Sequence, residues 1–383
     1  MPTFDVAIIG GGIIGCSSAA MLADRGLRVA LVESTAIGAG ASGRNLGVLQ
    51  HPFDAVLAPL FHDSLDRYVR LATEVDAGFE VSEHPTGILL VDTDADAVRA
   101  QADRLRTSVP ELRAEFLDAD AVAATEPSLA RGFAACRLET GHPVPPAAAT
   151  AAWARVAERG GVEFHVGTPA EPWLEDGRVA GVRLADGSTI GADRVLLAAG
   201  PWTPPLADAT GEWQPIVRTW GVTVQVDLGE AAPRHVVEQD EVDAVNRPAR
   251  ALERAAASGE EIEPESLFSI ASAAGISTLG STFLPAAPDT EQVAQLLLMR
   301  GAAYLPALAD APIVAVRHCA RPQSVDGRPF IGRLPAEGLY VCAGHGPWGI
   351  SIGPATASLA VEAILSDSDD HVAPELRAGR AIG

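Results

Sequence analysis

Residues 4–15 read FDVAIIGGGIIG. The apolar run before the glycines predicts a buried strand over residues 4–9, and residues 13–25 predict a helix. Residues 28–32, RVALV, predict a second buried strand. A strand, a helix and a second strand in this order, with strands that are apolar almost throughout, are typical of a parallel sheet covered on both faces. The expected fold class is therefore α/β.

The glycines of this stretch fit the pattern G-x-G-x-x-G at Gly10, Gly12 and Gly15. The first glycine of the pattern permits a tight turn, the second lets the backbone approach a pyrophosphate, and the third lets the helix pack closely on the strand. The helix N-terminus then presents free N–H groups to the phosphates. Glu33 closes the second strand, at roughly the 20-residue spacing of a carboxylate that binds ribose hydroxyls. The stretch predicts a dinucleotide-binding unit without separating NAD from FAD.

Composition narrows the class of protein further. A chain of 383 residues, 48% of them apolar, is long enough for two domains with sizeable cores. The net charge of −22 argues against nucleic acid and anionic membranes as partners. All 28 basic residues are arginine. The cysteines form no CxxC pair, which argues against a zinc site or a disulfide framework; they are Cys16, Cys136, Cys319 and Cys342.

The cysteine usage favours a cytoplasmic protein. Asp5 stands where a signal peptide would carry basic residues, so no signal peptide is expected. No apolar run of about 18 residues is free of charge, so no membrane span is expected either.

The rest of the chain alternates between helical and strand-like patterns. Helices are expected over residues 54–78, 94–107, 118–124, 146–160, 290–303 and 355–366. Strands are expected over residues 84–91, 162–166, 194–200, 216–228 and 338–344, with two more strands within 267–283 and a hairpin turn at Asp186-Gly187. Segment 238–266 is rich in Glu, Ala and Arg, and predicts either a solvated helical cover or a disordered insert.

Four blocks carry a resemblance to a known family. They are TAIGAGASGRNLGV (35–48), LLAAGPW (196–202), RPQSVDGRPFIG (321–332) and GHGPWGI (344–350). In this order they resemble the D-amino-acid oxidase-like superfamily of FAD-dependent oxidoreductases, which includes glycine oxidase, sarcosine oxidase and D-amino-acid dehydrogenase. The blocks span nearly the whole chain and do not specify the substrate.

The resemblance implies that FAD is the cofactor. The block 41–48 is then expected at the pyrophosphate and flavin, Ala170 at adenine, and residues 345–351 at the flavin pyrimidine edge. A helix N-terminus at that edge would stabilise the negative charge of reduced flavin. The FAD-contacting residues expected in this way are Gly10, Gly12, Ile13, Ile14, Gly15, Glu33, Ser34, Ala41, Ser42, Arg44, Asn45, Leu46, Gly47, Val48, Ala170, Ala199, Gly200, Trp202, Cys319, Gly344, His345, Gly346, Pro347, Trp348, Gly349 and Ile350.

On the substrate side, Arg321 matches the arginine that anchors the substrate carboxylate in amino-acid oxidases of this superfamily. The planar guanidinium suits a bidentate carboxylate contact, and the alternative role is a surface salt bridge. Two features depart from the family. Pro347 stands where glycine oxidases carry a second arginine, and the chain has no lysine to activate oxygen as sarcosine oxidases do.

Cys319 stands two residues before Arg321, where monomeric sarcosine oxidases attach flavin through a thioether. The alternative is a buried cysteine at the end of a strand. His51, His345, Tyr304 and Trp348 are further candidates for the pocket, although each histidine is also a candidate for a structural hydrogen bond. Arg44 is expected to support the flavin loop.

We therefore expect a discontinuous, Rossmann-type FAD-binding domain made of residues 1–80, 140–215 and 318–383. A substrate domain on a mixed, largely antiparallel sheet is expected over residues 81–139 and 216–317. The expected partners are a small amine or amino acid and an electron acceptor, either oxygen or another molecule. The sequence does not specify the acceptor or the oligomeric state.

The expected reaction moves a hydride from the carbon next to a neutral nitrogen to flavin N5, and water hydrolyses the resulting imine. Positioning supplies most of the rate, so no dedicated base is needed. A 2-hydroxy-acid oxidase or dehydrogenase is one alternative, and it would need a base such as His51 or His345. A second alternative is an accessory flavoprotein subunit that passes electrons to a partner. An exposed apolar patch near the C-terminal loop would favour it. The third alternative is an NAD-dependent dehydrogenase, and the block 41–48 and the Gly-His-Gly loop at 344–346 argue against it.

Overall fold

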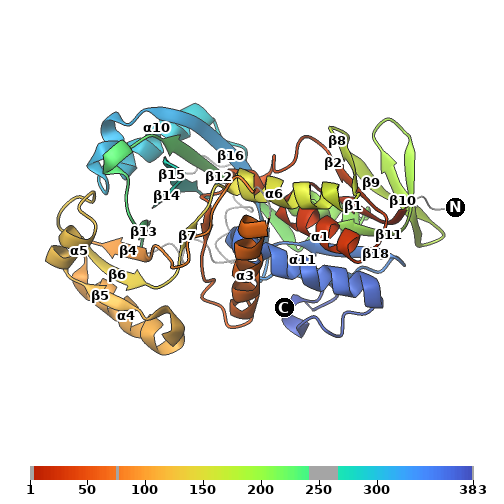
Figure 1. The fold of residues 1–383 in the computed structure, drawn as a ribbon, viewed down its shortest axis with the longest axis horizontal. Coiled ribbons are helices and arrows are strands. Elements are labelled where there is room, and N and C mark those ends of the chain that lie inside the picture. The colour runs from red at the N-terminus through yellow and green to blue at the C-terminus, as the bar shows by residue number, and fades with distance from the viewer. Residues whose placement is uncertain (1–3, 75–76, 241–265, 382–383) are drawn as a thin grey trace.

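The computed structural model describes residues 4–74, 77–240 and 266–381. Two eight-stranded sheets form two lobes, and helix α3 (Ala58–Glu74) lies between them (Figure 1). The expected α/β class is confirmed. The chain crosses repeatedly from one lobe to the other, so neither sheet is built from one continuous segment.

The first sheet has the strand order β17-β18-β11-β1-β2-β8, with β10 pairing β11 and β9 pairing β10. Its central neighbours β18, β11, β1, β2 and β8 run parallel, as the apolar strands predict. The strands are β1 (Phe4–Ile9), β2 (Val29–Glu33), β8 (Glu163–Val166), β9 (Ala170–Glu175), β10 (Arg178–Leu184), β11 (Thr189–Leu197), β17 (Phe330–Arg333) and β18 (Leu339–Ala343).

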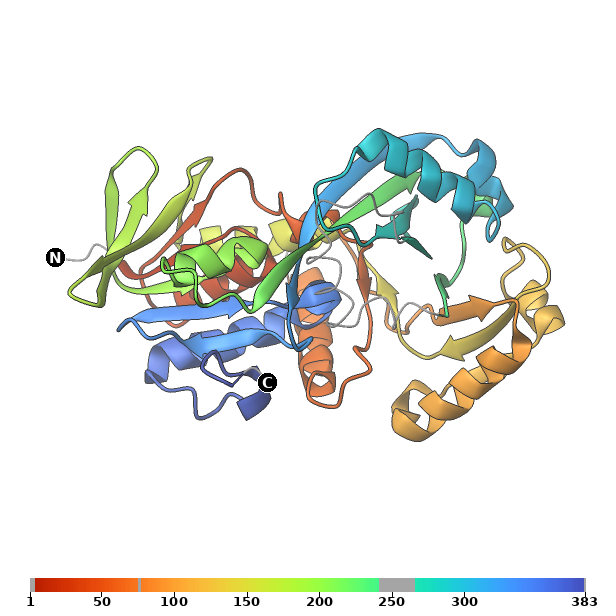
Figure 2. The ribbon, with the colours of Figure 1, turned by 180° about the vertical axis from the view of Figure 1, so that it is seen from behind.

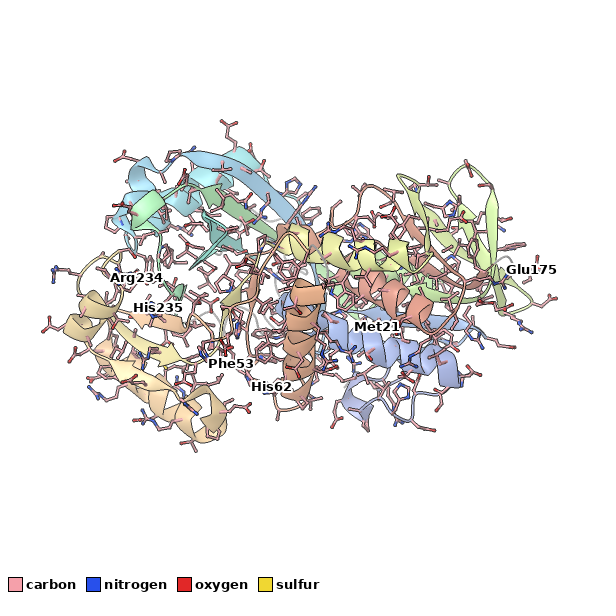
Figure 3. The ribbon with its side chains drawn as sticks, in the orientation of Figure 1. Met21, Phe53, His62, Glu175, Arg234 and His235 are labelled. Atoms are coloured by element: carbon pink, nitrogen blue, oxygen red, sulfur yellow. The ribbon has the colours of Figure 1, made fainter. Side chains whose placement is uncertain are left out.

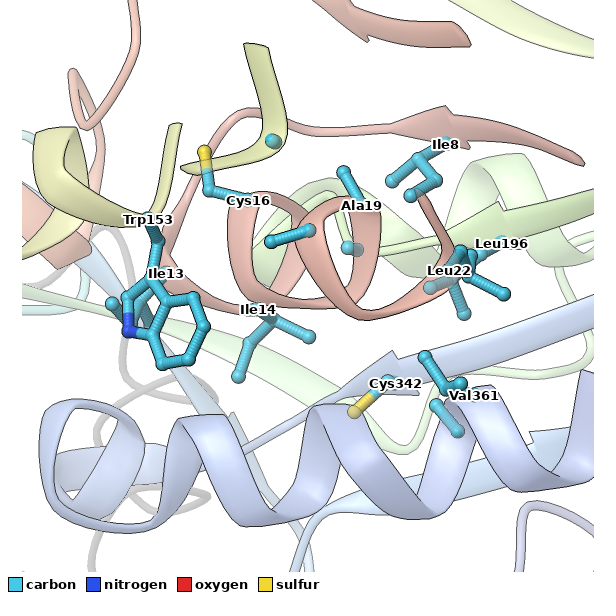
Figure 4. Close-up of a cluster of buried hydrophobic side chains, with 14 of the residues drawn as sticks. Ile8, Ile13, Ile14, Cys16, Ala19, Leu22, Trp153, Leu196, Cys342 and Val361 are labelled. Atoms are coloured by element: carbon cyan, nitrogen blue, oxygen red, sulfur yellow. The ribbon is translucent and has the colours of Figure 1, made fainter. Parts of the chain in front are cut away.

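Helices cover one face of this sheet. They are α1 (Ile13–Asp24), α6 (Pro146–Arg159) and α11 (Gly349–Ser366), with α3 packed on α11. Figure 4 shows part of the resulting core, in which Ile14 and Leu22 of α1 and Val361 of α11 belong to one buried cluster. The β9–β10–β11 hairpins and their apolar side chains cover the other face. Both faces of the parallel strands are therefore buried.

Two glycines let α1 approach the sheet. Gly10 has φ +119°, and a Cβ there would lie 2.4 Å from the Ala198 carbonyl oxygen. A Cβ at Gly15 would lie 1.8 Å from the Gly10 carbonyl oxygen. A side chain at Gly10 would therefore collide with the backbone that follows β11, and one at Gly15 would push the helix away from the turn after β1. This close packing holds the N-terminus of α1 at the carboxyl ends of β1 and β2.

The second sheet has the order β16-β12-β15-β14-β13-β4-β6-β5. All of its neighbours are antiparallel except β13 and β4, which run parallel. Its strands are β4 (Ile88–Asp92), β5 (Glu115–Leu117), β6 (Ala134–Leu138), β12 (Ile216–Val226), β13 (Val236–Gln239), β14 (Ser266–Ala273), β15 (Ile276–Thr282) and β16 (Ile313–Ser324). Helix α10 (Thr290–Gly301) packs on it, and α4 (Ala95–Ser108) and α5 (Ala119–Thr125) lie at its far end (Figure 2).

The remaining elements of the described residues are short. They are α2 (Ala41–Arg44), α7 (Thr203–Ala207), the two-stranded sheet of β3 (Val48–Leu49) and β7 (His142–Pro143), and 3-10 turns at Pro110–Leu112, Gly200–Trp202, Gly229–Ala231, Pro306–Asp310, Gly346–Trp348 and Pro374–Leu376. The first sheet takes strands from residues 4–33, 163–197 and 330–343, and the second takes strands from 88–138 and 216–324. The exact domain boundaries stay a prediction. Most of the acidic segment 238–266 lies outside the described residues.

Residues Gly346–Ser366, which are α11 and the turn before it, are long and apolar enough to cross a bilayer by length and composition alone. The most apolar window of these residues is 67% buried inside the protein, mainly against α1 and α3. The core helix of a globular protein passes the same test, because such a helix is apolar on every side.

A buried carboxylate fixes the start of β13. Glu126, 1% exposed, accepts hydrogen bonds from the backbone N–H groups of Arg234 and His235, from the His235 ring at 2.9 Å, and from Ser128 at 2.7 Å. Figure 3 shows Arg234 and His235 at this corner of the second lobe. Burial opposes ionisation, but the hydrogen bonds from His235, Ser128 and the backbone outweigh it and hold the Glu126 pKa below its usual value.

Glu126→Gln should therefore destabilise the protein by about 1–3 kcal/mol at pH 7, because one acceptor oxygen is replaced by an N–H₂ group that faces other donors. The contribution of a carboxylate with a lowered pKa is present above its unfolded-state pKa of about 4.3, and is lost as the pH falls through the folded-state value. Denaturant unfolding of both proteins at pH 7 and below pH 4 measures the difference. Equal stability at pH 7 would contradict this role for Glu126.

Candidate functional site

A cavity of about 790 Å³ begins at the carboxyl ends of β1 and β2 and extends to the second sheet. This is where open parallel sheets bind their ligands, beyond the strand ends. One end is lined by residues that follow β2 and by Ala170, and the other by residues of β12 and β16. The cavity therefore joins the two lobes in one continuous space.

The N-terminus of α1 faces the first end. Gly12 precedes the helix, and a Cβ there would lie 2.9 Å from Ser42 Oγ. The Ile13 N–H donates to the same Ser42 oxygen at 2.9 Å. The Ser42 hydroxyl of α2 therefore contacts the start of α1. Ile13 and Ile14, in the first turn of α1, line the cavity. This positive helix end favours an anion such as a pyrophosphate.

Glu33 ends β2 with its carboxylate in the cavity wall. It accepts hydrogen bonds from Gly11 N–H at 2.7 Å and from Thr35 N–H at 2.9 Å. These contacts fix the orientation of the carboxylate, and a carboxylate offers about four acceptor positions. Oε1 also accepts from the hydroxyls of Ser34 and Thr35, at 3.1 and 3.0 Å, whereas the Gly11 N–H donates to Oε2. Oε2 is therefore the oxygen that can also accept from a ribose hydroxyl of a nucleotide.

The N-terminus of α11 faces the cavity as well. The turn Gly346–Trp348 leads directly into the helix, and residues 345–351 line the cavity wall. The positive ends of two helices thus face one elongated cavity, each suited to a negative group. FAD offers two such groups, a pyrophosphate and a ring that becomes anionic on reduction. The residues present therefore fit FAD.

Nearly all the FAD contacts expected from the sequence lie in this cavity wall. Those that line it are Gly10, Gly12, Ile13, Ile14, Glu33, Ser34, Ala41, Ser42, Arg44, Asn45, Leu46, Gly47, Val48, Ala170, Ala199, Gly200, Trp202, Cys319, His345, Gly346, Pro347, Trp348, Gly349 and Ile350. Gly15 and Gly344 do not line it. Gly15 lies behind the turn against Gly10, and Gly344 forms a turn with φ +87° against Ile216 and Phe330.

Arg321 lines the end of the cavity at the second sheet. It stands on β16 opposite Thr219 of β12. Its Nη2 donates to Ser281 Oγ at 3.3 Å, and its guanidinium carbon lies 4.6 Å from the centre of the Phe283 ring. Gly221 leaves room for this arrangement, because a Cβ there would lie 3.3 Å from Arg321 Nη2. The guanidinium is therefore held across β12 and β15.

His51 does not reach the cavity, although the sequence offered it as a base. Its ring is buried, and Nε2 contacts Glu111 at 2.7 Å. Burial lowers its pKa more than Glu111 raises it. The Phe53 N–H donates to His51 Nδ1 at 3.2 Å, so in the neutral ring Nε2 carries the proton.

The hydrogen bond from the Phe53 N–H to His51 Nδ1 also determines whether His51 can bind a metal ion. The ligand atoms of His51, His62 and Glu111 lie within 4.8 Å of one another, in a group that could hold a metal ion (Figure 3 labels His62 and Phe53). A protonated Nε2 has no lone pair to give to a metal. The contact of His51 with Glu111 is therefore a hydrogen bond between the loop before α3 and the Pro110–Leu112 turn.

His345 lines the cavity, but its imidazole is buried and occupied. Nε2 hydrogen-bonds with Thr356 Oγ1 at 2.8 Å, and burial lowers the pKa of His345 to about 3. So low a pKa makes His345 a weak base at neutral pH. Trp348 lies in the wall as expected, whereas Tyr304 stacks on Phe268 at 4.3 Å and lines a separate, smaller cavity.

Two arginines join the loop around α2 to β16. Arg44 donates to the His318 carbonyl oxygen at 3.0 Å, and Arg317 donates to the Asn45 carbonyl oxygen at 3.1 Å. Thr223 Oγ1 on β12 donates to the Arg44 carbonyl oxygen at 3.1 Å. The loop that follows the nucleotide end of the cavity is therefore fixed to the second sheet, in keeping with the supporting role expected for Arg44.

Sequence reasoning missed most of the cavity wall supplied by the second sheet. The additional polar and aromatic residues there are Trp220, Thr223, Glu238, Ser269, Ser281, Phe283 and His318. The alternation in residues 216–228 marked β12 as having one buried face, but not which ligand that face would meet. For Glu238, the sequence feature that could have indicated a place in the cavity wall is an acidic residue directly after the apolar pair Val236-Val237.

Comparison with known proteins identifies the family of the chain. The sequence matches the family described as FAD dependent oxidoreductase over residues 5–363. It is 30% identical over 392 aligned positions to glycine oxidase from Pseudomonas aeruginosa, covering 98% of this chain and 99% of that protein. It is 32% identical over 291 positions to D-amino acid dehydrogenase from Cereibacter sphaeroides, covering 72% of this chain and 60% of that protein.

Solved structures of similar proteins have the same fold as this chain. The crystal structure of glycine oxidase from Bacillus cereus superposes with a TM-score of 0.80 and 25% identity, over 100% of both chains. L-proline dehydrogenase from P. horikoshii superposes with a TM-score of 0.78 over 98% of this chain and 96% of that chain. At 20% identity, the second likeness shows the fold alone.

Gly12→Val should abolish FAD binding, because the new side chain would fill the space between α1 and Ser42 that a pyrophosphate must approach. The unchanged protein should be yellow as purified or after incubation with FAD. Absorbance spectra and equilibrium dialysis with FAD measure both. A Gly12→Val protein that binds FAD as well as the parent would contradict the assignment of this end of the cavity.

Cys319 stays a candidate for covalent attachment, since it lines the cavity and is not in a disulfide. Burial raises the pKa of its thiol, although Arg321, Arg44 and Arg317 partly oppose the shift. The thiolate is the reactive form, so burial disfavours thioether formation. We expect acid precipitation to leave the flavin in the supernatant, and flavin that precipitates with the protein would establish a covalent link instead.

Proposed function

The chain belongs to the family of FAD-dependent oxidoreductases, and on that basis we propose that it oxidises a small amine or amino acid at the carbon bonded to nitrogen. FAD, when bound, supplies the acceptor for the hydride of that C–H bond. The curated relatives include a glycine oxidase and a D-amino acid dehydrogenase, which supports a substrate of this class.

The position of Arg321 carries the proposal. It is a fixed cation in the wall at the second sheet, held by Ser281 and by the face of Phe283. A guanidinium grips a carboxylate through two parallel hydrogen bonds, which fixes the direction of the rest of the substrate. An amino acid anchored in this way presents its α-carbon at a defined place, and positioning of this kind supplies much of the rate in such reactions.

The histidines of the cavity favour an amine over a 2-hydroxy acid. A hydroxy acid needs a base to take its hydroxyl proton, whereas the lone pair of a neutral amine drives hydride departure without one. His51 lies outside the cavity, and His345 is hydrogen-bonded to Thr356 with its pKa lowered to about 3. His318 also lines the cavity, but strand alternation places its side chain on the face of β16 opposite to Arg321, beside Trp220.

An accessory subunit would be expected to expose an apolar docking patch near the C-terminal loop. In residues 344–351, all of which the structure describes, no large apolar side chain is exposed. Large exposed apolar side chains lie instead on β16, at Ile313, Val314 and Val316. The surface near the loop therefore gives no support to that alternative.

Arg321→Met should lower the second-order rate of flavin reduction by amino acids roughly 10- to 100-fold, because a charge-assisted hydrogen bond contributes about 1.5–3 kcal/mol. Arg321→Lys should recover only part of the rate, since an ammonium cannot grip both carboxylate oxygens. Anaerobic bleaching of the flavin by amines, N-methyl amino acids, D-amino acids and 2-hydroxy acids measures these rates without depending on the acceptor.

Simple amines that lack a carboxylate are the matched control, and their rates should hardly change in Arg321→Met. A purely structural role for Arg321 predicts instead lost FAD or an equal loss with every substrate. A folded, flavin-loaded Arg321→Met protein with unchanged kinetics on its best carboxylate substrate would overturn the proposed role.

A further inference from the structure

The loop of residues 51–54, between β3 and α3, contacts the cavity wall from outside. None of these four residues, all of which the structure describes, lines the cavity. The Phe53 ring lies edge-to-face against Trp348, with ring centres 6.2 Å apart and planes at 75°. Trp348 lines the cavity directly before the first turn of α11. Phe53 therefore contacts an aromatic residue of the wall without belonging to the wall itself.

The backbone of Phe53 is in an unusual conformation. Its φ is +48°, in the left-handed region where the Cβ of a residue other than glycine crowds the backbone. Such a conformation persists only where the surrounding structure holds it. The Phe53 N–H donates to His51 Nδ1 at 3.2 Å, as a backbone N–H donates to the side chain of Asn or Asp two residues earlier in an Asx turn. The His51 ring therefore holds the turn that places the Phe53 ring.

Contacts at both ends hold the loop itself. His51 Nε2 contacts Glu111 Oε1 at 2.7 Å, in the turn that follows α4. At the other end, Asp54 accepts two hydrogen bonds from Arg328, at 3.0 and 3.1 Å. Both partners are distant from the loop in the chain, so the tertiary structure holds Phe53 between two fixed points.

The hydrogen bond to Phe53 requires a neutral His51 ring. Nδ1 accepts only while it has a lone pair, and a protonated ring would present a second donor to the Phe53 N–H. The titratable groups that face the ring are Glu111 and His62 of α3, whose ring centre lies 6.0 Å away. Burial lowers the pKa of His51 more than Glu111 raises it, and His62 lowers it further. The hydrogen bond is therefore present at pH 7, and is lost only as the pH falls below the ordinary histidine value of about 6.5.

We propose that the turn from His51 to Phe53 is a positioning device that holds the Trp348 ring in the cavity wall and thereby helps the protein to retain FAD. His51 and Phe53 are positioning residues, because neither lines the cavity and both act through Trp348. Trp348 precedes α11, so a change in its position alters the wall beside the N-terminus of that helix. The inference does not depend on which substrate the protein oxidises.

The first test is a double-mutant cycle of Phe53→Leu and Trp348→Leu in the FAD-loaded protein at pH 7. Leucine fills apolar space without presenting a ring edge, so Phe53→Leu should speed the release of FAD roughly 2- to 10-fold. Since Phe53 acts through Trp348, Phe53→Leu should have no further effect once Trp348 is replaced. Release is followed by the fluorescence of free flavin after dilution. Visible circular dichroism of the bound flavin gives a second readout that needs no dissociation.

Variants of His51 test the hydrogen bond to Phe53. The side-chain oxygen of Asn can accept from the N–H two residues later, so His51→Asn should retain FAD as well as the unchanged protein at pH 7. His51→Leu offers no acceptor and should release FAD as fast as Phe53→Leu. In the unchanged protein, release should accelerate as the pH falls below about 6.5. His51→Asn should lack this acceleration, because an amide does not titrate.

Trp213→Leu is the matched control. Trp213 forms a similar edge-to-face pair with Phe330, with ring centres 5.7 Å apart and planes at 75°, and neither residue lines the cavity. Its replacement removes a Trp–Phe contact of the same kind. It should lower the free energy of unfolding without changing the release of FAD or the circular dichroism of the flavin.

Three results would each contradict the proposal. Additive effects of Phe53→Leu and Trp348→Leu would show that Phe53 does not act through Trp348. Release from His51→Leu as slow as from the unchanged protein would remove the role of His51, and this comparison decides the matter even where Phe53→Leu does not fold. Equal acceleration in Trp213→Leu would assign faster release to a general loss of stability.

Discussion

The close approach of α1 to the first sheet is the constraint on which the rest of the molecule depends. At Gly10 and Gly15 the backbone fills the space that side chains would take, so the helix begins directly beyond the ends of β1 and β2. The cavity starts at this point, with the N-terminus of α1 on one side and Glu33 on the other. A longer distance between helix and sheet would remove both the binding edge and the anion-favouring helix end.

A second set of contacts extends that edge into the other lobe. Arg44 and Arg317 donate to backbone carbonyl oxygens on opposite sides of the junction, and Thr223 adds a third hydrogen bond. Guanidinium groups suit this task, because each has several donors in a fixed plane and can contact more than one carbonyl. The result is a single cavity whose nucleotide end is built by the first sheet and whose other end, the proposed substrate end, is built by the second.

The chemistry of the substrate end is set by strand register. Arg321, Ser281 and Gly221 come from three adjacent strands, and the missing side chain at Gly221 leaves the space in which the guanidinium lies. Glu238 and Ser269 come from the next two strands of the same sheet. The strands hold an arginine and a buried acid in the wall of one cavity.

The sequence by itself determined the α/β class, the parallel apolar strands, the FAD family and most of the nucleotide end of the cavity. These are local properties, because the glycine pattern, Glu33 and the block 41–48 act within a few residues of where they stand in the chain. Only the tertiary structure decided the substrate end. It placed His51 against Glu111 instead of in the cavity, and brought Glu238 and Phe283 into the wall. The position of Glu238 depends on the pairing of β13 with β4, more than a hundred residues away in the chain, and a periodic pattern specifies the buried face of a strand but not its neighbour.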